Sequence, residues 1–74
     1  ILMILTVDAR SRSTYGAVIM DAWAHGIEIE KLDGYNLELC SADEERLAGL
    51  IKRNPSVTIL HRELIKEVTN GTII

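Results

Sequence analysis

The sequence predicts a small α+β domain with a ferredoxin-like βαββαβ plait, followed by an extra C-terminal helix or hairpin. Two segments with helical spacing alternate with four strand-like segments, and right-handed crossovers on both sides of a central hairpin give the plait. The 74 residues, 47% of them hydrophobic and 26% charged, suffice for one globular domain. We therefore expect a single domain over 1–74, with its core in 1–62 and a tail in 63–74.

The first strand is expected at 1–7, an apolar run interrupted only by Thr6. A run of this kind is typical of a strand that is buried on both faces. The polar segment 9–14 then forms a loop, and Ser13 caps a helix that ends near His25. The helix has one apolar stripe, which we expect in the core: Tyr15, Val18, Ile19, Ala22 and Trp23.

A hairpin follows, because 27–30 and 37–39 alternate strictly between apolar and acidic residues on either side of an Asp-Gly turn. A two-residue loop would mix acids and apolar residues on each face of the hairpin. A three-residue loop, 32–34, instead pairs Ile29 with Leu37 and keeps one face apolar, so we expect that register.

The second helix is the most clearly marked element. Ser41 and Glu44 form a capping box at its start, with Ser41 as the N-cap residue. Lys52 and Arg53 occupy its last turn, where the helix dipole favours positive charge, and Pro55 follows its end.

A fourth strand is expected at 57–60. The tail from His61 onward shows helical spacing, which we favour, although the residues on either side of Asn70-Gly71 suit a hairpin equally well. The tail is therefore predicted to be a helix, with a hairpin as the alternative.

The outer face of the predicted sheet carries a candidate interface. The first and fourth strands are apolar on both faces, so their outward residues form an exposed apolar patch, which usually marks an interface. The hairpin adds acidic side chains to the same face. The expected interface residues are Leu2, Ile4, Leu60, Glu28, Glu30 and Glu38. We expect a second copy of the chain, another protein or the tail in 63–74 to cover this face.

Charge is uneven along the chain, whose net charge is −3. The segment 27–45 holds seven acids and one Lys, a net −6, whereas 46–74 holds five bases and two acids, a net +3. This asymmetry favours oriented assembly of the chain with itself or with another protein. It disfavours nucleic acid as a partner, because nucleic acids bind net basic surfaces.

A second candidate site is the loop between the first strand and the first helix. A helix N-terminus offers free N–H groups, and two guanidiniums and three hydroxyls lie beside it. These residues are Arg10, Ser11, Arg12, Ser13 and Thr14. Such a set suits a phosphate or carboxylate ligand, so the loop predicts an anion-binding site.

The element order and lengths over 1–62 resemble those of ACT-type regulatory domains, which pair and bind amino acids at the loop after the first strand. In this sequence Arg10-Ser11-Arg12 replaces the proline-glycine turn that is frequent in that family. A fainter resemblance is to the small plait subunits of CRISPR adaptation, which carry an Asp at the end of the first strand, as Asp8 does here. Both resemblances concern pattern alone.

Catalytic, metal and cofactor sites are not expected. Cys40 is the only cysteine, and His25 and His61 stand far apart, so no zinc site can be written. No nucleophile–base pair or cofactor fingerprint can be assembled from the sequence. The longest apolar run is far shorter than a bilayer span, and a lone cysteine suits a reducing, cytoplasmic compartment.

The leading hypothesis is therefore a non-enzymatic interaction or regulatory module that forms a homodimer or binds a larger protein. The alternative hypothesis is a small-molecule sensor that binds an anionic metabolite at the loop 10–14. A third hypothesis is a nucleic-acid-associated plait in which Asp8 contributes to the site.

Overall fold

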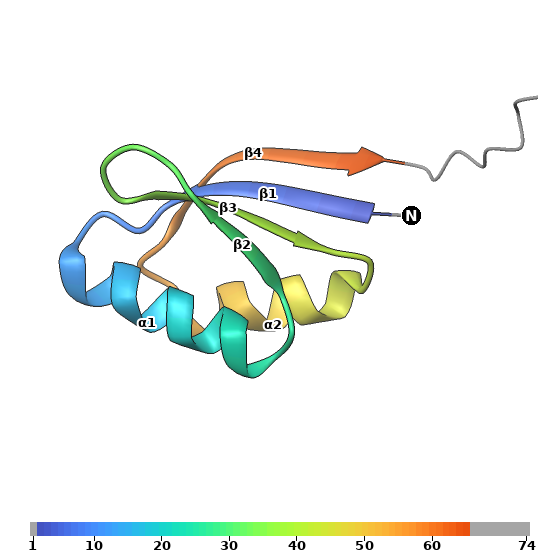
Figure 1. The fold of residues 1–74 in the computed structure, drawn as a ribbon, viewed down its shortest axis with the longest axis horizontal. Helices are drawn as coiled ribbons and strands as arrows, with labels where there is room; N and C mark the ends of the chain where they lie inside the picture. The colour runs from blue at the N-terminus through green and yellow to red at the C-terminus, as the bar shows by residue number, and fades with distance from the viewer. Residues whose placement is uncertain (1, 66–74) are drawn as a thin grey trace, which may run out of the picture.

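The computed structural model describes residues 2–65 and contains two helices and one four-stranded sheet (Figure 1). The elements are β1 Leu2–Asp8, α1 Arg12–Ala24, β2 Glu28–Lys31, β3 Asn36–Ser41, α2 Glu44–Arg53 and β4 Thr58–Ile65. All neighbouring strands are antiparallel, in the order β2-β3-β1-β4. The predicted small α+β domain with this element order is confirmed at that level.

Both helices lie on the same side of the sheet, and the other side is open (Figure 1). The core lies between the helices and the sheet, and its buried apolar residues are Met3, Leu5, Val7, Val18, Ala22, Ile27, Leu37, Leu39, Leu47 and Leu50. Along β1, buried side chains alternate with half-buried or exposed ones. The expectation that this strand is buried on both faces was therefore wrong, because the helices cover only one face.

The β2–β3 hairpin has a different register from the predicted one. Ile29 lies opposite Leu39, and the Leu32 N–H donates to the Asn36 carbonyl at 3.0 Å. Residues 33–35 form the loop, in which Gly34 takes a positive φ of 63° that a side chain would disfavour. The apolar face is nevertheless the expected one, because the register differs by an even number of residues and side chains alternate with a period of two.

Each helix begins at a different residue from the one predicted. The N-cap residue of α1 is Ser11, whose Oγ accepts a hydrogen bond from the Thr14 N–H at 3.2 Å. The N-cap residue of α2 is Asp43, which accepts from the Glu45 N–H at 3.0 Å. Ser41 cannot cap this helix because it is still the last residue of β3, and its Oγ instead accepts from the Asp43 N–H.

The fourth strand is longer than predicted, and the helix expected from His61 is absent as far as Ile65. Strand β4 pairs with β1 from Asp8–Thr58 to Leu2–Ile65, so it uses nearly the whole length of the β1 edge. Backbone pairing with that edge overrides the helical spacing of the side chains. The choice between helix and hairpin for 66–74 lies outside the described residues.

Candidate interaction surface

Strand β4 exposes large apolar side chains along one edge of the sheet. Four of its eight residues form what we call the β4 strip: Ile59, Leu60, Leu64 and Ile65, with exposed fractions of 45%, 54%, 50% and 39%. Within residues 2–65, no strand pairs with the outer edge of β4. A long apolar strand with an unpaired edge is a template for pairing with another chain.

A bulge shapes the strip. Thr6 lies opposite His61 but Val7 lies opposite Ile59, so Leu60 has no partner on β1. Beyond the bulge, His61 takes the open-face position that Leu60 was expected to occupy. Ile59 lies on the helix-covered side and His61 on the open side, so the alternation of faces is interrupted at Leu60.

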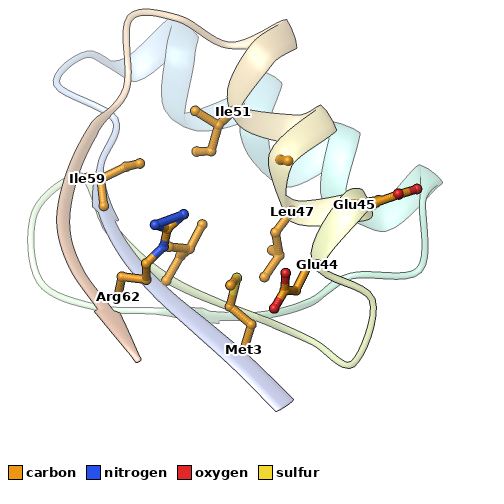
Figure 2. A pocket seen from close by; sticks show the side chains of 9 residues that line it. Met3, Glu44, Glu45, Leu47, Ile51, Ile59 and Arg62 are labelled. Carbon is orange, nitrogen blue, oxygen red and sulfur yellow. The ribbon is translucent and has the colours of Figure 1, made fainter. Parts of the chain in front are cut away.

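A groove of about 340 Å³ runs between β4 and α2 (Figure 2). Its apolar wall consists of Met3, Leu5, Leu47, Ala48, Ile51 and Ile59, and its polar rim consists of Glu44, Glu45 and Arg62. Figure 2 shows that the Arg62 side chain extends from β4 into the groove. Arg62 takes part in none of the ion pairs formed among residues 2–65. The groove exists because α2 packs on the sheet without covering β4.

The open face of the sheet divides into an acidic part and an apolar part. On β2 and β3, Glu30 lies directly opposite Glu38. At the other end of the sheet, Leu2 lies opposite Ile65. The predicted interface residues therefore do not form one patch: the three Glu residues lie on the hairpin, Leu2 and Ile4 lie on β1, and Leu60 lies at the bulge in β4.

Cys40 and Ile4 lie side by side at the centre of the open face, and both are half-buried. Burial raises the pKa of the Cys40 thiol, and the neighbouring carboxylates of Glu28 and Glu38 raise it further. The thiol therefore stays protonated at neutral pH, which disfavours thiolate chemistry at this position.

The loop predicted to bind an anion makes contacts within the protein. Arg10 has a positive φ of 70°, its N–H donates to Asp8 Oδ1 at 2.9 Å, and its Nη1 donates to Thr58 Oγ1 at 3.1 Å. Ser11 and Thr14 are joined by the cap of α1 and by a hydrogen bond between their hydroxyls. Arg12 and Ser13 are exposed on the first helical turn. The five residues lie together, and the anion site stays a prediction.

The outer surface of α1 is a further apolar patch that the sequence analysis missed. Trp23 was expected in the core, but 82% of its surface is exposed, as is 69% of that of Met20. Val18 and Ala22 of α1 are buried in the core, and Asp21 pairs with Arg53 and therefore faces α2. Trp23 follows two residues later, roughly 200° around the helix axis, and so points away from α2.

The pairing of Asp21 with Arg53 clamps the two helices together. The guanidinium donates from Nε to Oδ2 at 2.9 Å and from Nη2 to Oδ1 at 2.8 Å. The Asn54 amide donates to the same carboxylate at 2.9 Å, and His25 Nδ1 lies 2.9 Å from it. These contacts, with the Arg53 hydrogen bond first, lower the pKa of Asp21 despite its burial. The clamp holds α2 in place as one wall of the groove.

Residues 2–65 contain no cluster of three or more His, Cys, Asp or Glu side chains that could hold a metal ion. None of the helices in this part of the chain is long and apolar enough to span a membrane. Comparisons with protein-family models, with curated proteins and with solved structures find no match to this chain. The function of the domain is therefore inferred from the surfaces described above.

Proposed function

We propose that this domain is a ferredoxin-like plait that acts as a non-enzymatic interaction module in the cytoplasm. It assembles as a homodimer through β4 and the adjoining end of β1. The observation that carries the proposal is the β4 strip, in which a strand at the edge of the sheet exposes four large apolar side chains. The strand order supports the plait, and the lone Cys40 supports a reducing compartment.

The energetics of a small domain support this assembly. A core in a chain of about 70–80 residues stabilises it by roughly 3–5 kcal/mol. Complete burial of one Leu or Ile side chain contributes about 1.5–3 kcal/mol. A symmetric dimer uses the same surface twice, so each strip residue that becomes buried contributes twice to the complex. Covering the strip therefore removes apolar surface from water in both copies and stabilises the assembled form.

The mass in solution tests the proposal. Light scattering over a wide dilution range is expected to give a dimer for the wild type and a monomer for Leu64→Lys. The matched control is Met20→Lys, which places the same charge on an exposed apolar position of α1. We expect this control to remain a dimer. A wild type that stays at 8.3 kDa throughout the concentration range would contradict the homodimer.

A further inference from the structure

We propose that the second copy adds to the outer edge of β4 in antiparallel orientation, with the two Arg62 residues opposite each other across a two-fold axis. This inference rests on the proposed function and specifies the geometry of the same surface. It involves residues 60–64 of each copy, which would join two four-stranded sheets into one continuous sheet.

The faces of the sheet restrict the register. Directly opposite residues of an antiparallel pair lie on the same face. His61 and Glu63 lie on the open face, because their partners on β1 are Thr6 and Ile4. Arg62 lies on the helix-covered face, opposite the buried Leu5. A symmetric pair that keeps each face continuous must therefore centre on a single residue. Near the middle of β4, the candidate centres are His61, Arg62 and Glu63.

Charge then selects among these three centres. A pair centred on Glu63 places two carboxylates opposite each other, and one centred on His61 places two imidazoles opposite each other. The pair centred on Arg62 places His61 of each copy opposite Glu63 of the other. It also places Leu60 opposite Leu64. This register therefore has two pairs of complementary polarity and two apolar pairs.

The direction of the Arg62 side chain makes this register tolerable. It extends into the groove beside α2, which lies on the inner side of β4 and away from the free edge (Figure 2). The two guanidiniums are thereby directed apart, towards the rim of each groove with Glu44 and Glu45. On the open face, His61 Nε2 already lies 3.6 Å from Glu63 Oε1 of its own strand. In the dimer, the two His61 and the two Glu63 side chains alternate around the two-fold axis.

The bulge limits the paired segment. Face matching is lost on the far side of Leu60, where Ile59 would lie opposite Ile65 although the two belong to different faces. Pairing therefore covers five residues of each strand. Ile59 and Ile65 flank the pair, with Ile59 in the wall of the groove and Ile65 on the open face.

Disulfide cross-linking measures the register directly. Residues opposite each other have Cα atoms about 4.5–5.5 Å apart, within the range of about 4.4–6.8 Å that a disulfide spans. In a Cys40→Ser background, Arg62→Cys is expected to give roughly tenfold more cross-linked dimer under mild oxidation than Leu64→Cys, because two residues at 64 lie about 13 Å apart along the strands. Glu63→Cys reports the register shifted by one residue.

A charge exchange provides a test that keeps Arg62. His61→Glu places two carboxylates opposite each other, so it is expected to raise the dimer dissociation constant by about tenfold. Glu63→Lys removes the polar contact between His61 and Glu63 and is expected to raise the dissociation constant by less. The double variant places opposite charges across the pair again and is expected to restore dimer formation.

The outcomes separate the two proposals. Preferential cross-linking of Arg62→Cys with recovery in the double variant supports this register. A dimer by light scattering that cross-links at Glu63→Cys, or at none of the three positions, overturns this inference and leaves the interaction module in place. A wild type that is monomeric at every concentration overturns the homodimer itself.

Discussion

The two edges of the sheet differ in length, charge and exposure. Strand β2 has four residues, three of which are charged: Glu28, Glu30 and Lys31. Strand β4 has eight residues, and the β4 strip makes up half of them. Proteins protect edge strands from unwanted pairing by making them short and charged. The β2 edge is short and charged, whereas the β4 edge is longer and exposes four large apolar side chains, so the difference indicates the direction in which the domain can assemble.

Protection of the β2 edge has a local energetic cost. Glu30 and Glu38 lie directly opposite each other on the open face, where like charges are destabilising. The β4 edge has no such repulsion within the domain, but it leaves apolar surface in contact with water. The charges on β2 thus keep that edge solvated at some cost in folding stability. The β4 edge, in contrast, is stabilised when another surface covers it.

The largest effect is expected from breaking the sheet that carries both edges. Leu39 is fully buried on the central strand β3, and truncation of such a residue costs about 2–5 kcal/mol. Leu39→Ala is therefore expected to leave little or no stable fold at 25 °C, as measured by chemical denaturation. Leu32→Ala, at an exposed loop position, is the control and is expected to change stability by less than about 0.5 kcal/mol.

The next largest effect is expected when charged residues replace apolar residues on β4, because this edge would then repel a second copy as the charged β2 edge does. Leu60→Lys combined with Leu64→Lys removes two apolar pairs from the proposed interface and places like charges opposite each other. The dimer dissociation constant is expected to rise roughly 100-fold or more in sedimentation experiments. The melting temperature should also lose its dependence on protein concentration. A dissociation constant within threefold of the wild type would argue against the strip as the interface.

Removing the Asp21–Arg53 pair, which holds α2 as one wall of the groove, is expected to have an intermediate effect on stability that depends on pH. Asp21→Asn is expected to lower stability by about 1–2 kcal/mol at pH 7, because the carboxylate accepts charged hydrogen bonds. The pKa of Asp21 is lowered below its ordinary value of 3.8 in the folded state. Its contribution is therefore present above pH 3.8 and is lost as the pH falls through the folded-state pKa.

Melting temperatures of the wild type and Asp21→Asn at pH 7 and at pH 2.5 provide the measurement. The difference between the two proteins should shrink markedly in acid. A difference that is the same at both pH values would show that the carboxylate charge does not carry the effect.

The smallest effect is expected on the protected edge. Glu30→Gln removes the repulsion with Glu38 and is expected to stabilise the fold by about 0.2–1 kcal/mol. Dimer formation should not change, because β2 is at the opposite edge of the sheet. Combining it with Glu38→Gln should add little further stability, since either substitution removes the same repulsive pair.

Several features followed from local patterns in the sequence. Alternation in the hairpin identified its apolar face even though the register was wrong, because an even shift leaves the faces unchanged. The helices were found from their spacing and flanking polar residues. Their first residues were misplaced, since Ser41 was already held in β3 and the chain turned at Arg10 earlier than expected. Exposed apolar positions at Leu2 and Leu60 were anticipated, whereas those at Leu64 and Trp23 were not.

The sequence by itself determined the order of the elements, the single apolar core and the acidic hairpin, because these depend on the period of side chains along a segment. Only the tertiary structure decided the length of β4, the bulge at Leu60, the groove beside α2 and the exposure of Trp23. Each of these depends on a neighbour that is distant in the chain: β1 offers an edge to β4, and Arg53 of α2 pairs with Asp21, on the side of α1 away from Trp23. Local periodicity specifies which side of an element is apolar, but the packing of other elements decides which part of that side is covered.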